Sequence, residues 1–165
     1  MEHRLFSAVL MLAVGAIGMA LLGSGYANAA PPADTPAARY QTECGACHMA
    51  YPAKLLPAGT WTRIMGGLDQ HFGDNAELSP ALRDELTRYL TDNARRSRTA
   101  TDATPLRITD QRWFLREHRE IPKRMVTSND KVRIFSNCAA CHGQAAQGRF
   151  SEHGVRIPGY GGWED

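Results

Sequence analysis

The four cysteines of this 165-residue chain form two Cys-x-x-Cys pairs, and a histidine directly follows each pair. The first set is Cys44-Gly45-Ala46-Cys47-His48, and the second is Cys138-Ala139-Ala140-Cys141-His142. Two thiols at this spacing can add to the two vinyl groups along one porphyrin edge, and the adjoining histidine can then ligate the iron. The sequence therefore predicts two covalently attached c-type haems, held through the four cysteines, with His48 and His142 as axial ligands.

A Cys-x-x-Cys pair has two other common uses. It can be a thioredoxin-like dithiol, or it can be half of a zinc site. A zinc site made of four cysteines would leave both adjoining histidines unexplained, and the βαβ pattern of a thioredoxin-like domain is absent from the sequence. The haem interpretation is therefore favoured, with zinc and dithiol chemistry as its alternatives.

The N-terminus indicates export. A short segment with Arg4 precedes an apolar run from Leu5 to Leu22, and Ala27-Asn28-Ala29 follows. This arrangement is typical of a secretory signal peptide, residues 1–29, cleaved after Ala29. The alternative is an uncleaved membrane anchor, because the run is just long enough to span a bilayer. Covalent haem attachment in bacteria takes place outside the cytoplasmic membrane, so both features predict the periplasm.

Removal of the signal peptide leaves 136 residues that contain both motifs. Each motif would then belong to a unit too small for a large side-chain core, and a covalently held haem would supply much of that core. We expect a mainly α-helical, monomeric protein with an N-terminal haem unit over 30–104 and a C-terminal haem unit over 105–165. The polar, apolar-poor residues 91–104 are the predicted linker.

Five helices are expected from caps and periodicity. The first runs from Asp34 or Thr35 into the first motif, and the second begins at Thr60. The third begins at Ser79-Pro80. The fourth runs from Gln111 to about Glu120, with Thr109 or Asp110 as its cap, and Pro122 closes it. The last begins at Ser128 and carries Val132 and Phe135 into the second motif, and the glycine-rich tail is expected to be mostly loop.

A second axial ligand for the first haem is suggested by a stripe of apolar side chains. Trp61, Ile64, Leu68 and His71 recur at helical spacing, and a histidine at the end of an apolar stripe needs a reason. That reason could be a hydrogen bond in the core or ligation of the haem iron. Met65 competes, since a thioether also ligates haem iron, but we expect it to pack in the core.

His118 is the corresponding candidate in the second half. It shares a predicted helix face with Phe114, Leu115 and Ile121, although a surface position is its alternative. His153, in a Ser-Glu-His-Gly turn, is a weaker candidate. His71 lies 23 residues after His48, and His118 lies 24 residues before His142, so local pairing keeps loop-closure entropy small. A crossed pairing stays open.

The charge is distributed unevenly along the predicted mature chain. Residues 30–104 contain 8 Lys/Arg and 9 Asp/Glu, whereas residues 105–165 contain 10 and 7. This excess is too small to indicate nucleic-acid binding. The basic side chains of the fourth helix region are predicted to meet an acidic partner surface: Arg112, Arg116, Arg119, Lys123 and Arg124.

Several segments together resemble the small periplasmic dihaem cytochromes c of bacteria. In the first half these are 44–52, 55–57, Trp61 and 68–73, and in the second half they are 107–109, 113–114, 117–122, 137–142 and 156–158. The resemblance implies two low-spin haems with two histidine ligands each, which favours His71 and His118 over His153. It also implies electron donation to a small oxygen-binding monohaem cytochrome, with a membrane quinol-side protein or another cytochrome as donor.

These features predict an electron carrier rather than an enzyme. An iron with two histidine ligands has no open position for a substrate, so it can only exchange electrons, and at a lower potential than His/Met ligation would give. The alternatives are a dihaem peroxidase-like or reductase-like enzyme and a haem-based sensor. Both need one open coordination site, so the spin state of the iron separates them from the carrier.

Overall fold

The computed structural model describes residues 34–97 and 103–163, so the predicted signal peptide and its cleavage after Ala29 lie outside the described residues. The described chain is mainly α-helical, as predicted. Within these two ranges, no helix combines the length and the apolar character needed to cross a bilayer.

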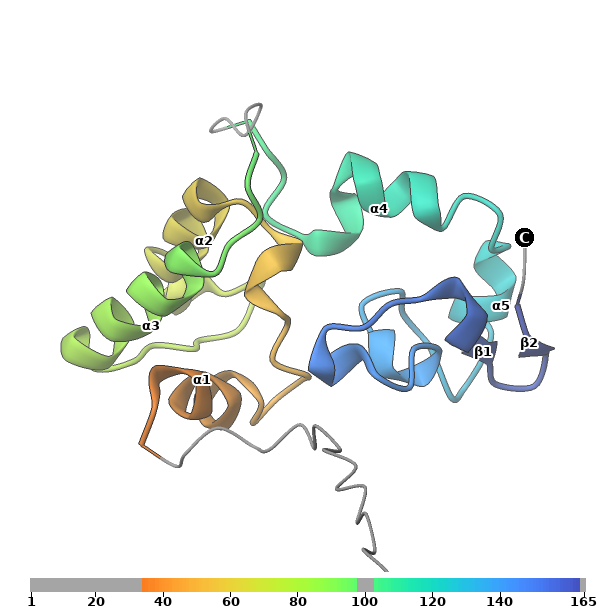
Figure 1. Ribbon diagram of the computed structural model, residues 1–165, viewed down its shortest axis with the longest axis horizontal. Helices are drawn as coiled ribbons and strands as arrows, with labels where there is room; N and C mark the ends of the chain where they lie inside the picture. The colour runs from red at the N-terminus through yellow and green to blue at the C-terminus, as the bar shows by residue number, and fades with distance from the viewer. Residues whose placement is uncertain (1–33, 98–102, 164–165) are drawn as a thin grey trace, which may run out of the picture.

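The first unit, residues 34–97, contains three helices: α1 (Pro36–Cys44), α2 (Ala58–Met65) and α3 (Pro80–Asp92) (Figure 1). Single 3-10 turns at Ala53–Leu55 and Leu68–Gln70 flank α2. The caps of two helices match the sequence expectation. The Thr35 hydroxyl accepts a hydrogen bond from the Ala38 amide at the start of α1, and Ser79 precedes Pro80 at the first position of α3.

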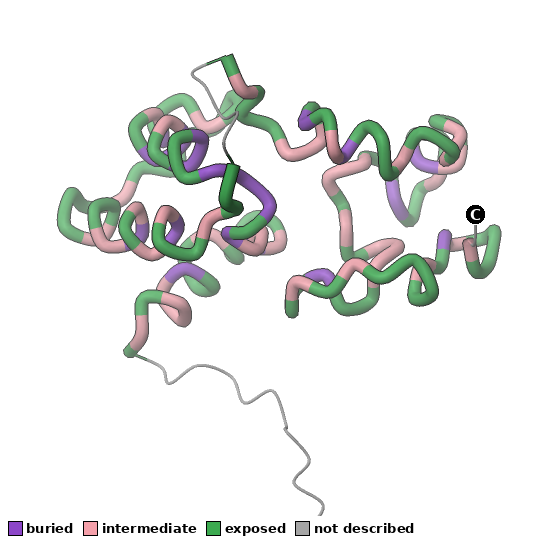
Figure 2. Tube along the Cα trace, turned by 45° about the horizontal axis from the view of Figure 1, so that its top comes forward, coloured by how far each residue is buried: buried purple, intermediate pink, exposed green. Residues whose placement is uncertain are grey.

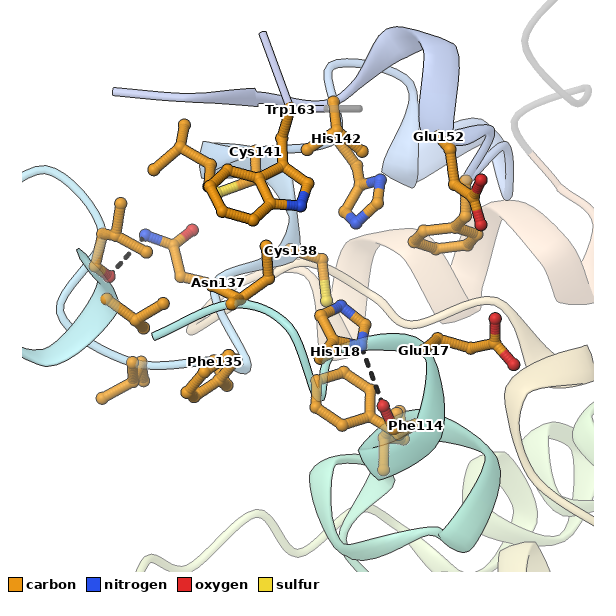
Figure 3. Close-up of a pocket in the computed structure, with 18 of the residues that line it drawn as sticks. Phe114, Glu117, His118, Phe135, Asn137, Cys138, Cys141, His142, Glu152 and Trp163 are labelled. Atoms are coloured by element: carbon orange, nitrogen blue, oxygen red, sulfur yellow. Dashed lines mark hydrogen bonds between the residues drawn. The ribbon is translucent and has the colours of Figure 1, made fainter. Parts of the chain in front are cut away.

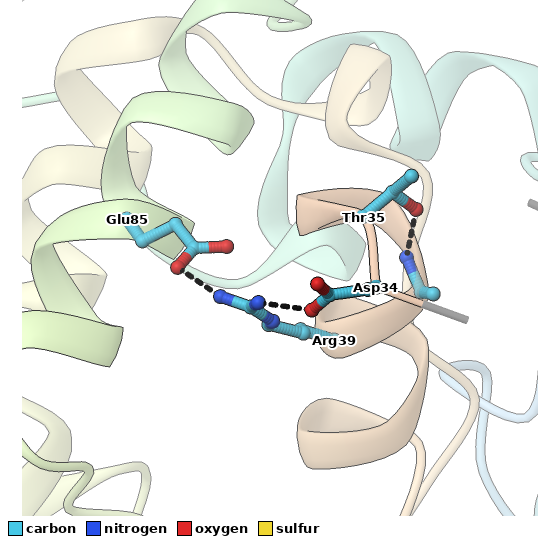
Figure 4. Close-up of polar contacts among 5 residues, drawn as sticks. Asp34, Thr35, Arg39 and Glu85 are labelled. Carbon is cyan, nitrogen blue, oxygen red and sulfur yellow. Dashed lines mark hydrogen bonds and ion pairs between the residues drawn. The ribbon is translucent and has the colours of Figure 1, made fainter. Parts of the chain in front are cut away.

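The core of this unit lies where α3 packs against α2 and α1 (Figure 2). Leu86 and Leu90 of α3 are fully buried, and Trp61 and Met65 of α2 lie in the same cluster. An ion pair of 2.6 Å between Arg39 of α1 and Glu85 of α3 joins the two helices, and Arg39 also contacts Asp34 (Figure 4). These contacts hold the helix that ends in the first haem motif.

The second helix differs from the prediction at both ends. It begins after Pro57, and Thr60 lies inside it as a buried residue rather than a cap. It ends at Gly66-Gly67, because two successive glycines disfavour continuing a helix. The predicted face from Trp61 to His71 is therefore wrong as a single helix, and a 3-10 turn carries the chain on to His71.

The second unit, residues 103–163, consists of short elements (Figure 1). Its α-helices are α4 (Arg112–Glu117) and α5 (Lys123–Thr127), and its 3-10 turns are Ile108–Asp110, Cys138–Ala140, Ala145–Gln147 and Glu152–Gly154. A small antiparallel hairpin joins β1 (Arg156–Ile157) to β2 (Gly161–Gly162), with Arg156 opposite Gly162. The expectation of a loop-rich tail is met apart from this hairpin.

One helix prediction in this unit is shortened and one is wrong. The fourth helix starts one residue after the predicted Gln111, with Gln111 rather than Thr109 or Asp110 at its cap, and it ends at Glu117 rather than near Glu120. Leu115, predicted on the inward face, is 57% exposed. The helix predicted from Ser128 is absent, and the shorter α5 ends there instead. Asn129 explains the stop: its side chain accepts from the Lys131 amide and donates to the Pro158 carbonyl, which favours a turn.

Arginine side chains connect the two units. The Arg95 guanidinium of the first unit lies 5.4 Å from the centre of the Trp113 ring of the second. Arg107 lies 4.3 Å from the centre of the Phe72 ring, next to His71. The cationic groups near the predicted linker therefore contact aromatic rings as well as solvent.

Candidate haem-binding sites

The first motif leaves α1 at its last residue, Cys44. A side chain at Gly45 would place its Cβ 2.1 Å from the Gln41 carbonyl oxygen, so a glycine is required for the motif to turn away from the helix here. The Nδ1 atom of His48 lies 2.8 Å from the Met49 carbonyl oxygen. As the donor of that bond, Nδ1 carries the proton, and Nε2 keeps a lone pair for a metal.

The structure brings His71 opposite His48. Their ring centres are 6.2 Å apart, and the planes differ by 17°. Burial lowers the pKa of His71, and the neighbouring His48 lowers it further, which favours the neutral imidazole that ligates metals. The next residue, Phe72, has a φ of 55°, in the left-handed region that a bulky residue rarely occupies. This turn, rather than a helix face, directs His71 toward His48.

The second pair is His118 and His142, again with ring centres 6.2 Å apart but with planes that differ by 72°. His118 directly follows α4, and its Nδ1 lies 2.9 Å from the Phe114 carbonyl oxygen, so its Nε2 is also available to a metal. Burial lowers the pKa of His142, with His118 as a further cause. Figure 3 shows the two rings next to one another, with Cys138 and Cys141 beside them.

The distance between the two ring centres of each pair can be compared with the distance expected when both histidines ligate one metal ion from opposite sides. A ring centre lies about 1.2 Å from its ligating nitrogen and a metal–imidazole bond is about 2 Å long, so opposed ligands have ring centres about 6.4 Å apart. Both observed separations, 6.2 Å, agree with this requirement. The structure thus brings together both locally paired sets of histidines and neither crossed set.

A largely apolar cavity surrounds the second pair (Figure 3). Its lining includes Phe114, Val126, Phe135 and Trp163 of the second unit, together with Leu55 of the first. It is lined by aromatic and aliphatic side chains on several sides, as a flat apolar macrocycle would require. Leu55, at the end of a 3-10 turn of the first unit, therefore borders the site of the other unit.

Two indole N–H groups in this lining have no hydrogen-bond partner. The Nε1 atoms of Trp113 and Trp163 are buried and unpaired, as is Nδ1 of His142. A buried donor without an acceptor is costly, so such groups usually have a partner. A haem carries two propionate groups, which are strong acceptors, and the lining therefore fits that group in polarity as well as shape. Residues 113–114 belong to the segments that resemble the dihaem family, but neither Trp113 nor Trp163 was predicted to have a role in a haem site.

The thiols fit attachment better than the alternatives. All four cysteines are free in the described residues, and burial raises the pKa of Cys138 and Cys141 and raises that of Cys44 to about 11. A raised pKa favours the neutral thiol at Cys44, Cys138 and Cys141, unlike the activated thiolate of a dithiol catalyst. Over residues 34–97 and 103–163, no three His, Cys, Asp or Glu side chains are grouped so that they could hold a metal ion.

The competing ligand candidates lie elsewhere. Met65 is buried in the core of the first unit, as expected for a packing residue. His153 is exposed in a 3-10 turn and is not part of the cavity lining. The described structure therefore places His71 and His118, and not these two residues, opposite the motif histidines.

Comparisons with known proteins agree with this site chemistry. The new dihaem cytochrome c of Shewanella baltica OS155 is 48% identical, with a TM-score of 0.70, over 79% of this chain and 99% of that one. Two structures of the Rhodobacter sphaeroides dihaem cytochrome are 47% and 46% identical, with TM-scores of 0.58 and 0.61, each over 68% of this chain and 95% and 94% of theirs. No curated protein matches the chain.

The family comparison covers both motifs. Residues 40–150 match the dihaem cytochrome c family, a range that contains all four cysteines and four of the five candidate ligand histidines. Together with the two opposed histidine pairs, this match shows that the chain belongs to the dihaem cytochrome c family and carries two c-type haems.

Proposed function

We propose that the protein is a periplasmic electron relay in which each haem iron has two histidine ligands, His48 with His71 and His142 with His118. The observation that carries this proposal is the 6.2 Å separation of the ring centres in both pairs. When bound, haem supplies one-electron chemistry at its iron. Histidines on both faces leave no position for a substrate, so electron exchange is the chemistry that the site favours.

The surrounding residues suit this role. Backbone carbonyls next to Nδ1 of His48 and His118 orient two of the rings and raise their basicity as ligands. The apolar lining around His142 limits the access of water, and a dry environment keeps the solvent reorganisation of an electron-transfer step small. The chain thus holds the ligands rigidly and excludes competing reactions at the iron.

The spin state of the purified protein tests the proposal. Absorption and resonance Raman spectra should show two low-spin haems in both the oxidised and the reduced protein. A high-spin haem in either state would contradict the relay and favour a dihaem peroxidase-like enzyme or a haem-based sensor, because both need one open position. Intact-mass spectrometry should give the mass of a chain beginning at Ala30 plus two haems.

The partner that we propose is a small oxygen-binding monohaem cytochrome, with an acidic surface that meets the second unit. Arg112, Lys123 and Arg124 are exposed on and beside α4 and α5. Arg116 and Arg119 are exposed as well, although ion pairs of 2.6 Å to Glu117 and 3.1 Å to Glu120 offset part of their charge. Interfaces between redox proteins are small, so these charges would act mainly by steering the encounter.

A further inference from the structure

Tyr51 lies between the two haem sites. It follows the first motif by three residues, and its ring stacks on that of His48, with centres 4.9 Å apart and planes 28° apart. The Tyr40 hydroxyl of α1 donates to the Tyr51 carbonyl at 2.6 Å, so α1 fixes the backbone of Tyr51 as well as the motif. The tyrosine is therefore held firmly against the axial ligand of the first site.

The other end of the Tyr51 side chain reaches the second unit. Its hydroxyl donates to the Ser136 carbonyl at 2.8 Å, a contact between residues 85 positions apart. Ser136 lies two residues before Cys138, and the Cys138 sulfur lies 3.5 Å from the same carbonyl oxygen. One side chain thus touches the iron ligand of the first site and the backbone that carries a haem-attaching cysteine of the second.

We propose that Tyr51 is the positioning residue that joins the two haem sites and sets the rate of electron exchange between them. This inference rests on the proposed relay. The exchange moves one electron from ferrous iron at one site to ferric iron at the other, no bond forms or breaks, and Tyr51 itself is not oxidised. The hydrogen bond from Tyr51 to Ser136 holds the two sites at a fixed separation, and electron exchange slows steeply when that separation grows or the contact opens.

The Tyr51→Phe variant tests the hydroxyl alone, because it keeps the ring on His48. Absorption spectra should still show two low-spin haems. The rate of exchange between haems, measured from the broadening of haem methyl NMR signals in half-reduced protein, should fall several-fold. Hydrogen exchange at residues 136–138 should become faster by roughly threefold to tenfold, the fold-change expected from one lost hydrogen bond.

Tyr89→Phe is the matched control, since Tyr89 lies in α3 and its ring contacts Tyr40 within the first unit. This variant should leave the exchange rate unchanged. An unchanged exchange rate in Tyr51→Phe would overturn the inference, as would an equal loss of rate in both variants, which would indicate a general effect of destabilising the first unit. High-spin haem in the unsubstituted protein would instead contradict the relay itself, so the two failures are distinguishable.

Discussion

At the residue scale, the ligand histidines depend on neighbours that set their tautomer and their charge. The carbonyls of Met49 and Phe114 lie next to Nδ1 of His48 and His118, and burial lowers the pKa of His71 and His142. Both effects favour a neutral ring that offers a nitrogen lone pair to iron. The assignment of each histidine can therefore be tested by single substitutions with independent spectroscopic outcomes.

His71→Ala should convert the first haem to high spin and leave the second unchanged, because only one pair of rings loses a member. His118→Ala should do the reverse. His153→Ala is the control, since this residue is exposed and outside the cavity, and both haems should stay low-spin. Electron paramagnetic resonance of the oxidised proteins measures all three. High-spin haem in His153→Ala would show that the second site is wrongly assigned.

Trp113→Phe should lower the midpoint potential of the second haem. The unpaired Nε1–H of Trp113 is available to a propionate, and without that donor the carboxylate charge is less dispersed and stabilises ferric iron. Phenylalanine keeps an aromatic face for Arg95. Spectroelectrochemical titration measures the change. Trp61→Phe is the control, because the Trp61 indole donates to the Ala53 carbonyl in the first unit. This variant should leave the midpoint potential of the second haem unchanged.

At the element scale, α3 supports the first site without contributing a ligand to it. Its side chains Leu86 and Leu90 are fully buried against the cluster that holds α1 and α2. Because α1 ends in Cys44, the packing of α3 on α1 fixes where the first motif begins. The second unit has only short helices, so its cavity depends more on the bound macrocycle for packing.

Leu86→Ala should destabilise the protein by about 2–5 kcal/mol, the usual cost of removing a buried leucine side chain and leaving a cavity. Chemical denaturation followed by absorption and by tryptophan fluorescence gives the free energy of unfolding. Leu115→Ala serves as the comparison, because Leu115 is 57% exposed and its loss should change that free energy little. Equal effects of the two substitutions would contradict the proposed role of α3.

At the scale of the whole molecule, the two units present different surfaces to a partner. The helices of the first unit lie on one side of the molecule, and α4 and α5 lie on the other (Figure 1). The second half has the net positive charge, so encounter with an acidic cytochrome should favour that side. This orientation would bring the partner closer to the second haem than to the first.

Electron transfer to the partner should slow as salt rises, because screening acts over about 8 Å at physiological ionic strength. Reversing Arg116 and Arg119 to Glu should lower the association rate in stopped-flow mixing and leave both haem spectra intact. Reversing Arg83 and Arg88 on α3 changes the net charge equally at a distant position, and Arg83 is likewise paired with a neighbouring acid at 2.9 Å. If both double variants lowered the association rate equally, the effect would come from the net charge of the protein rather than from a docking site on the second unit.

Much of the chemistry is local in sequence and could be predicted. The thiol spacing and the adjoining histidine of each motif need no tertiary contact to be recognised, and two haems follow from them. The starts of α1 and α3 are equally local, since the Thr35 side chain caps the first turn of α1 and Pro80 occupies the first position of α3. By contrast, the helix predicted from Ser128 failed because Asn129 bonds to Pro158, a partner 29 residues away.

The sequence by itself determined which residues could bind haem, because attachment chemistry depends on residue type and short spacing. Only the tertiary structure decided how these residues meet. Helical periodicity suggested His71 and His118. His118 caps α4 and stacks on Phe114 with ring centres 3.9 Å apart, as that periodicity predicts. However, α2 ends before Gly66, so His71 does not lie on the predicted helix face. A turn beyond the end of α2 directs the His71 ring, and the contact between Tyr51 and Ser136 joins segments 85 residues apart. Such placements depend on how the elements pack, which no local periodicity encodes.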